Sequence, residues 1–424
     1  MTASASTALP SSVAAATTAT TTTTTSALIP VDVQAQVLSQ ASHMPSALEI
    51  AHALSMCTMS FANATLDDTH PLCQQFHLER LVIIIRDADA KAVSFFRAKL
   101  NVLVFRFCED DAPVEQLLSM DDGEQSSAVF SKLGLPSKSL DGVWTNLHFP
   151  PEIKQRLLCY ASSSMLFSDL GVDRNVVSAT RMVLLYGPPG TGKTSLCKGL
   201  AQQLAINFSA RFSTAHLVEV NSQAIFSKWF SESAKTVQKL FELIFELAST
   251  PRALVVVLLD EVESLVASRT RGNGGGGPGG DPSDALRVVN AMLLQLDKLK
   301  RYANVVMLCT SNVTHVLDDA FLDRADLRLF VGPPSPQACF DMLLGALVEL
   351  VRVGLVQAPV TNGTRDALGQ LAAELSGSAA SGRFLRKLPL QAHVRLAASD
   401  APVPADEFVR AMAAVAQDVG SLTF

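Results

Sequence analysis

The sequence predicts an α/β fold in which a parallel sheet is flanked by helices, with a small α+β domain before it and a bundle of helices after it. Residues 182–186 are an apolar run rich in β-forming side chains, as expected of a buried parallel strand. Residues 254–259 are consecutive apolar residues, enough for a buried central strand. From residue 183 onward, strand-like and helix-like segments alternate. Such alternation is typical of a parallel sheet with helices on both faces.

A glycine-rich loop with the pattern G-x-x-x-x-G-K-[ST] follows the first of these strands. The glycines let the backbone bend so that successive N–H groups point to one place, where phosphate oxygens bind. Lys193 supplies a positive charge for the β and γ phosphates, and Thr194 supplies a hydroxyl for Mg²⁺. The helix expected over residues 195–204 has its positive end at the same place. The predicted nucleotide-binding loop comprises Gly187, Pro188, Pro189, Gly190, Thr191, Gly192, Lys193, Thr194 and Ser195.

Two acids, Asp260 and Glu261, directly follow the apolar run 254–259. The carboxyl end of a buried parallel strand lies at the nucleotide crevice of such sheets. Asp260 can hold Mg²⁺ together with Thr194, and Glu261 can orient and activate the attacking water. Alone, two acids at this position could be a solvated strand end, but the phosphate loop upstream favours the catalytic interpretation. A further acid, Glu263, is interpreted as structural.

Three polar positions further along the chain are candidate parts of the same site. Asn312 follows another expected strand, 304–310, where it could position the water or contact the γ-phosphate; alone, it would more often be a turn residue. Arg324, or alternatively Arg328, could reach the nucleotide of a neighbouring subunit, although a surface ion pair explains either equally well. Arg383 opens a helix of the C-terminal bundle and could link that bundle to the γ-phosphate.

An aromatic pair and a run of glycines have no part in nucleotide chemistry. Trp229 and Phe230 stand between Lys228 and Glu232, and both cannot easily face a core. An exposed aromatic pair is suited to contact with an extended peptide. Residues 273–280 are nearly all glycine, which favours a loop of variable conformation.

The chain divides into five segments by composition. Residues 1–29 are almost entirely Ala, Thr and Ser, and are interpreted as a disordered tail. The other segments are a small α+β domain with a binding role at 30–130, a linker at 131–149, the large nucleotide-binding domain at 150–335 and a small helical domain at 336–424.

Helix and strand patterns subdivide these segments. In the α+β domain we expect a weakly amphipathic helix over 31–59, broken near Pro45, and strands at 81–85 and 100–107. The prolines at 150 and 151 begin a helix that continues over 152–167. The C-terminal bundle is expected to contain helices at 337–353, 364–375, 382–398 and 405–419.

Composition restricts the partners of the chain. A length of 424 residues suggests two or three domains. The net charge of −6 provides no electrostatic footprint for direct nucleic-acid binding, and no apolar run is long enough to cross a membrane. Seven cysteines are scattered without C-x-x-C spacing, which favours thiols in a reducing compartment over disulfides or a zinc site. We therefore expect a soluble intracellular protein.

Taken together, these motifs resemble those of the AAA+ ATPases, which combine a phosphate-loop parallel sheet with a C-terminal helical lid. The resemblance is closer to one AAA+ family, the pachytene checkpoint ATPases, and extends from about residue 135 to the C-terminus. The segments that carry it are residues 187–195, 226–233, 259–265, 282–290, 310–314, 321–326 and 381–389.

The resemblance implies a homohexamer that uses ATP and Mg²⁺ to remodel HORMA-domain proteins. Such an enzyme engages the N-terminus of its substrate in a central pore, with an adaptor presenting some substrates. Trp229 and Phe230 then correspond to the first pore loop and Arg383 to the lid arginine, whereas the segment 323–328 lacks the R-P-G-R spacing common in other AAA+ proteins, so Arg324 is a candidate from its position alone. The implied roles are disassembly of spindle checkpoint complexes and control of the meiotic chromosome axis, in the nucleus (chromosomes and kinetochores) and the cytoplasm.

Two alternatives remain open from the sequence. The first is an AAA+ disassembly motor with a non-HORMA substrate, which the N-terminal domain would determine. The second is a nucleotide-switched scaffold that binds HORMA proteins without turnover. The intact set Asp260, Glu261 and Asn312 argues against a scaffold, because a scaffold needs no residue that positions water.

Overall fold

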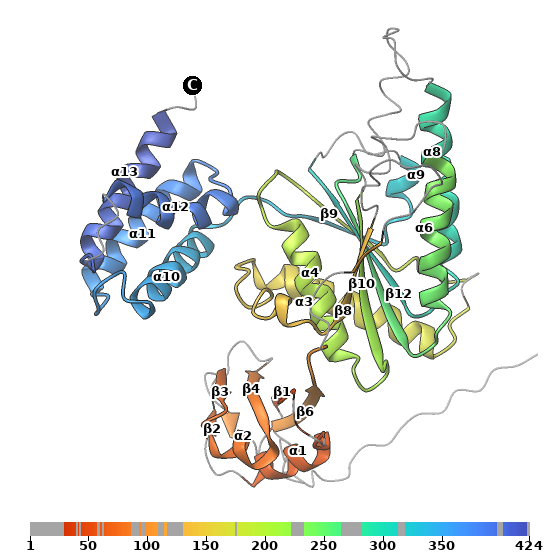
Figure 1. Ribbon diagram of the computed structural model, residues 1–424, viewed down its shortest axis with the longest axis horizontal. Helices are drawn as coiled ribbons and strands as arrows, with labels where there is room; N and C mark the ends of the chain where they lie inside the picture. Colours follow the sequence, from red (N-terminus) through yellow and green to blue (C-terminus); the bar gives the residue numbers. More distant parts are fainter. Residues whose placement is uncertain are drawn as a thin grey trace, which may run out of the picture.

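The computed structural model describes residues 29–39, 41, 44–56, 60–61, 63–85, 93–94, 98–108, 114–116, 130–173, 176–221, 233–263, 282–312, 319–396 and 402–421. Three groups of elements are visible in Figure 1. A small sheet with short helices comes first, a large sheet with helices on both faces follows, and a cluster of helices forms the C-terminal part.

The N-terminal group is a four-stranded sheet with strand order β3-β4-β1-β6. Strand β1 pairs antiparallel with β4 and parallel with β6. Helices α1 and α2 accompany this sheet, and β2 and β5 form a separate short ladder. The bounds are β1 (Ile29–Val37), α1 (Ala47–Ser55), β2 (Ser60–Phe61), β3 (Ala64–Asp67), α2 (Pro71–Phe76), β4 (Leu78–Ile85), β5 (Val93–Ser94) and β6 (Ala98–Phe105). The strands expected at 81–85 and 100–107 are therefore present as parts of β4 and β6.

The helix expected from residue 31 is wrong for its first part, because residues 29–37 form strand β1. Val31, Val33, Ala35 and Val37 are all buried. This spacing of two residues places them on one face of a strand, whereas a helix would scatter them around its axis. The helix itself is α1, which begins after Ser46, and Ser46 and Glu49 form a reciprocal capping box.

The central sheet has seven strands in the order β13-β9-β12-β11-β10-β8-β7. Five neighbouring strands run parallel, so their carboxyl ends lie along one edge. Strands β8 and β7 add antiparallel pairs at the other side. The bounds are β7 (Val114–Gln116), β8 (Phe130–Leu135), β9 (Met182–Tyr186), β10 (Thr214–Asn221), β11 (Ala253–Asp260), β12 (Val305–Ser311) and β13 (Leu327–Phe330).

Strand β8 changes the expected boundary between domains. Residues 131–135 were predicted to belong to a linker, but they pair antiparallel with β10 in the central sheet. Strand β7 pairs with β8 and lies within the segment predicted as the N-terminal domain. The remainder of the predicted linker contains the short 3₁₀ helix η2 (Lys138–Leu140) and packs against the sheet and α4 through Leu140 and Leu147.

Helices cover both faces of the central sheet (Figure 1). Strand β11 is buried on both sides, with alternate side chains entering two separate cores. Val255, Val257 and Leu259 pack with α6 (Ser233–Ala248) and α8 (Pro282–Leu299). Leu254, Val256 and Leu258 pack with α3 (Pro151–Asp169) and α4 (Lys193–Asn207). This double burial explains why residues 254–259 are continuously apolar.

Four helices form the C-terminal lid: α10 (Pro336–Arg352), α11 (Asn362–Gly377), α12 (Gly382–Arg395) and α13 (Ala405–Ser421). The first three begin at side-chain caps, namely Ser335, Thr361 and Ser381. Their shared core includes Leu343, Leu368, Leu385 and Phe408. All four expected helices are thus present. Within the described ranges, no helix combines the length and apolarity that a membrane span requires.

Candidate nucleotide site

The phosphate loop connects β9 to α4 and requires glycine at defined places. Gly187, Gly190 and Gly192 all have positive φ, at 148°, 76° and 94°. A Cβ atom on Gly187 would lie 2.2 Å from the carbonyl oxygen of Val331. Because that contact is with backbone, no side-chain rotation could relieve it. The loop conformation expected from the motif is therefore available only to this pattern of glycines.

Lys193 is buried at the first turn of α4. Its Nζ donates to the carbonyl oxygens of Gly187 at 2.8 Å and Pro188 at 2.7 Å. Burial lowers the pKa of Lys193, while the carboxylates of Glu263, Asp260 and Glu261 act to raise it. The ammonium therefore lies between the loop and three acids, where phosphate oxygens can replace its carbonyl partners.

Asp260 ends β11 beside the hydroxyl of Thr194. The Thr194 Oγ1 donates towards both carboxylate oxygens of Asp260, at 2.9 Å and 3.1 Å, and the Thr310 hydroxyl also donates to Asp260. Mg²⁺ prefers oxygen ligands and is usually bound by one or two protein groups together with substrate phosphates. The paired hydroxyl and carboxylate therefore fit Mg²⁺.

Glu261 follows directly in a left-handed backbone conformation, with φ of 55°. Its N–H donates to the Thr310 Oγ1 at 3.2 Å. This conformation is uncommon for residues other than glycine and often occurs at functional sites. The turn ends β11 at the cavity wall, where Glu261 is one of the lining residues.

Asn312 lies at the end of β12, beside the end of β11. Its backbone N–H donates to the Glu263 Oε1 at 3.1 Å. Glu263 therefore contributes to the site by holding the Asn312 segment, a role that its acidic side chain alone did not reveal in the sequence. The sequence does contain one indication of this role, because Glu263 follows Asp260 by about one helical turn and so lies near the same strand end.

The lid contacts the phosphate loop directly. The Arg383 N–H, in the first turn of α12, donates to the Gly190 carbonyl oxygen at 3.2 Å. A Cβ atom on Gly190 would lie 3.0 Å from the Cβ of Ser381, the cap of that helix. Arg383 thus lies beside the loop, close to where the γ-phosphate is expected.

These residues share one cavity of about 600 Å³. Its polar wall includes Lys193, Thr194, Asp260, Glu261, Asn312 and Arg383. A second wall comes from residues 146–150 and Ile153, and a third from the lid, including Met342 and Arg386. Residues 146–149 fall in the predicted linker, and their place at the site is not predictable from the sequence, because nothing local marks a segment that folds back onto a distant loop.

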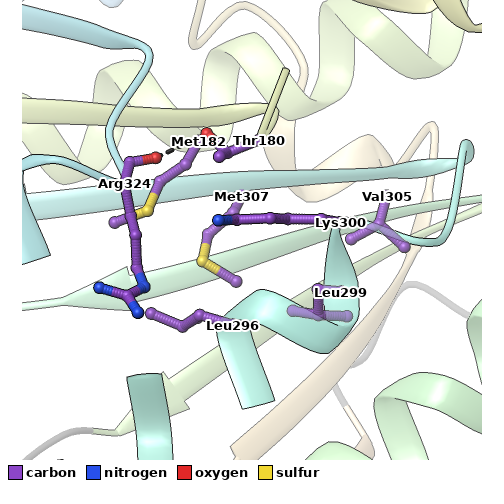
Figure 2. Close-up of a pocket in the computed structure, with 8 residues that line it drawn as sticks. All are labelled: Thr180, Met182, Leu296, Leu299, Lys300, Val305, Met307 and Arg324. Atoms are coloured by element: carbon purple, nitrogen blue, oxygen red, sulfur yellow. Dashed lines mark hydrogen bonds between the residues drawn. The ribbon is translucent and has the colours of Figure 1, made fainter. Parts of the chain in front are cut away.

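Arg324 and Arg328 do not line this cavity. The Arg324 guanidinium pairs with both carboxylate oxygens of Asp297 on α8, at 3.1 Å and 2.7 Å. Arg324 also borders a separate small cavity, where its carbonyl accepts a bond from the Thr180 hydroxyl (Figure 2). Arg328, on β13, is more exposed, and its guanidinium lies 3.7 Å from Asp323. An action of either arginine on a neighbouring subunit stays a prediction.

The aromatic pair Trp229 and Phe230, their neighbours Lys228 and Glu232, and the glycine-rich stretch 273–280 lie outside the described residues. The assignment of Trp229, Phe230 and their two charged neighbours to the substrate pore therefore rests on the sequence resemblance alone.

Comparison with known proteins agrees with this geometry. Residues 183–333 match the model of the ATPase family associated with various cellular activities (AAA). The chain is 44% identical over 320 residues to the pachytene checkpoint protein 2 homolog of Xenopus tropicalis, covering 72% of each chain. It is 29% identical to the solved structure of C. elegans PCH-2, covering 93% of this chain and all of that one, with a TM-score of 0.74.

A chain of the solved E. coli MS115-1 HORMA:CdnC:Trip13 complex shares the fold, with 17% identity and a TM-score of 0.52. It covers 66% of this chain and 93% of that chain. The expected α/β fold with its helical lid is confirmed, as is the expected ATPase activity. The chain belongs to the pachytene checkpoint protein 2 family and is an AAA ATPase.

Proposed function

We propose that this ATPase remodels HORMA-domain proteins. The observation that carries the proposal is the contact between Arg383 of the lid and Gly190 of the phosphate loop, beside a complete set of hydrolytic residues. Such a contact allows the nucleotide state to move the lid, which is what a mechanical enzyme needs and a passive binder does not. The choice of HORMA substrates is supported by family membership and by the solved complex in which a fold neighbour accompanies a HORMA protein.

In this proposal the phosphates of ATP lie against the backbone N–H groups of the loop, and Lys193 binds the β- and γ-phosphate oxygens. Glu261 orients the attacking water and accepts its proton, while Asn312 holds that water from the neighbouring strand end. Mg²⁺, held by Thr194 and Asp260, would supply positive charge against the phosphate oxygens. Arg383 then couples loss of the γ-phosphate to movement of the lid.

The assembly is proposed as a homohexamer acting in the nucleus and the cytoplasm. Arg324 or Arg328 would then act on ATP bound by the neighbouring subunit. Trp229 and Phe230, flanked by Lys228 and Glu232, would grip the substrate N-terminus in the central pore. An adaptor presents the substrate to the N-terminal domain.

The ATPase rate should be measured with and without a purified closed HORMA protein and its candidate adaptor. Wild type, Glu261→Gln and Glu246→Gln, which changes an exposed acid on α6, form the matched set. We expect stimulation in wild type and Glu246→Gln, and a rate lower by about 10²- to 10⁴-fold in Glu261→Gln with ADP affinity preserved. A steady rate unaffected by any HORMA protein would favour a motor with another substrate. Absence of turnover in wild type would favour the scaffold.

A further inference from the structure

His148 is the feature of the nucleotide cavity that the hydrolytic mechanism does not use. It lies in the segment 146–150 that folds against the phosphate loop, between the buried Leu147 and the partly buried Phe149. Its Nδ1 is 3.9 Å from the Asp341 Oδ2 on lid helix α10. The pair therefore joins two walls of the cavity that belong to different parts of the chain.

The surroundings of His148 suit a nucleotide base. The phosphates are assigned to the polar wall, so the base must lie towards the remaining walls. Phe149 comes within 3.3 Å of the Cβ position on Gly192, and the Met342 Cε within 3.8 Å of the Cβ position on Gly382. Phe149, Ile153 and Met342 thus provide apolar surfaces on the linker and lid sides of the loop. Ligand pockets of this kind obtain specificity from a few polar groups in a mostly apolar lining.

The protonation of His148 determines which polar group it offers. Burial lowers the pKa of His148 below its ordinary value of 6.5; Asp341 raises it, and Lys154 and Arg386 lower it. The imidazole is therefore neutral at pH 7, with one N–H donor and one nitrogen acceptor. The negative charge of the Asp341 carboxylate lies 3.9 Å from Nδ1, too far for a hydrogen bond, but it favours the tautomer with the proton on Nδ1. This tautomer leaves a lone pair on Nε2, at the opposite edge of the ring.

We propose that His148 is a specificity-determining residue for the base, its Nε2 accepting a hydrogen bond from the 6-amino group of adenine while Asp341 positions the ring. Guanine carries an oxygen acceptor at the same position, which would face the Nε2 lone pair without a proton between them. Leaving two such polar groups unpaired in a partly buried site reduces affinity on the order of 10- to 100-fold. The inference rests on the ATPase activity of this site and is independent of the HORMA substrate.

The test compares ADP and GDP affinities by calorimetry, and kcat/KM for ATP and GTP, in full-length protein. His148→Leu removes the acceptor, His148→Gln retains an amide oxygen, Asp341→Asn removes the carboxylate, and His52→Leu is a control on the exposed face of α1. Wild type and His52→Leu should prefer adenine by at least about 10-fold. The preference should fall to within about 3-fold in His148→Leu, by loss of adenine affinity, and take intermediate values in the other two variants. An unchanged preference in His148→Leu would overturn the proposal, as would an equal loss of affinity for both bases.

A pH series on wild type gives a second measurement that does not depend on a variant folding. When the pH falls below the pKa of His148, which lies below the ordinary histidine value, Nε2 takes up a proton and becomes a donor, so the adenine preference should decrease as the imidazole is seen to protonate by NMR. The preference of His148→Gln should not change with pH. A wild-type preference that stays constant while the imidazole of His148 protonates would contradict the inference. All these assays omit HORMA proteins, so a negative result would not contradict the proposed remodelling function. Equally, absence of remodelling would not contradict the recognition of adenine by His148.

Discussion

The backbone N–H of Arg383 donates to the carbonyl of Gly190 across 3.2 Å, which ties the first turn of lid helix α12 to the middle of the phosphate loop. The two residues are almost two hundred positions apart in the chain. The contact is made by backbone groups on both sides, so it depends on how closely the lid approaches and not on a polar side chain at either position. Gly190 is what permits this approach, because any Cβ would meet Ser381.

Replacing Gly190 with alanine should separate the lid from the loop. The new Cβ would lie 3.0 Å from the Ser381 Cβ, and φ at this position is 76°. We expect ATP affinity and kcat to fall, kcat/KM by on the order of 10²-fold, because small displacements of catalytic groups are costly. Nucleotide binding and steady-state kinetics measure this.

Gly354→Ala is the matched control: φ is 81°, but no atom lies within 4 Å of the added Cβ. It should lose about 1 kcal/mol of stability and keep normal kinetics. Normal kinetics in Gly190→Ala would show that the contact is dispensable.

Asp260→Asn should remove the dependence of nucleotide affinity on Mg²⁺. The amide has one oxygen where the carboxylate offers two to Thr194, and it carries no charge for a divalent cation. ADP affinity measured with and without EDTA should differ in wild type and coincide in the variant. Hydrolysis should fall by about 10²-fold or more. The exposed Asp366→Asn on α11 should behave as wild type. A variant that retained the full Mg²⁺ effect would remove Asp260 from the proposed metal site.

Arg324 and Arg328 should be distinguishable by stability. Arg324→Ala removes the bidentate ion pair with Asp297 and part of the lining of the cavity near Thr180. It should therefore lower the free energy of unfolding by about 1–2 kcal/mol. Arg328→Ala removes a half-exposed side chain and should be within about 0.5 kcal/mol of wild type. Thermal unfolding measures both. Mixing each variant with Glu261→Gln subunits then tests action across the interface. Restored turnover in the mixture identifies the trans-acting arginine, and the same deficit in both variants would refute a single trans-acting residue.

The lowered pKa of His216 should make the folded protein less stable in mild acid than at neutral pH. Burial is the main cause that lowers the pKa of His216 to about 4, and Lys132 lowers it further. Its Nδ1 is buried without a hydrogen-bond partner in the part of the chain that is described. Between pH 6.5 and 4 the unfolded chain takes up a proton at this residue and the folded chain does not. Stability therefore falls as pH decreases, by about 1–2 kcal/mol once partial exposure is considered.

Urea unfolding of wild type and His216→Gln at pH 7 and pH 5 measures this contribution. The loss on acidification should be smaller in the variant, because glutamine does not titrate. The exposed His52→Gln serves as control and should lose as much stability as wild type. An equal loss in all three proteins would assign the acid sensitivity to other groups.

The parts of the site that could be predicted are those encoded by neighbouring residues. The phosphate loop combines backbone geometry, a lysine and a hydroxyl within a few positions, so its chemistry is complete in one segment. Asp260 and Glu261 follow a run that is buried on both sides, and the run itself marks the strand end. Asn312 could be predicted for the same reason.

The missed elements depend on pairing between distant segments. Strand β8 belongs to the central sheet because it pairs with β10, which is some eighty residues further along the chain. Nothing in the six residues of β8 requires that partner. The strand β1 was predicted as helix although its alternate residues are apolar, because the surrounding stretch also has helix-forming composition.

The sequence by itself determined the α/β class, the helical lid and the residues of the polar cavity wall, because local patterns of apolar and polar residues dictate strands, helices and the loops that end them. Only the tertiary structure decided that Arg383 meets Gly190, that Glu263 holds Asn312 and that His148 joins Asp341 at the cavity. These contacts depend on how the lid and linker pack against the sheet, and packing follows from the shape of whole surfaces that no single segment contains.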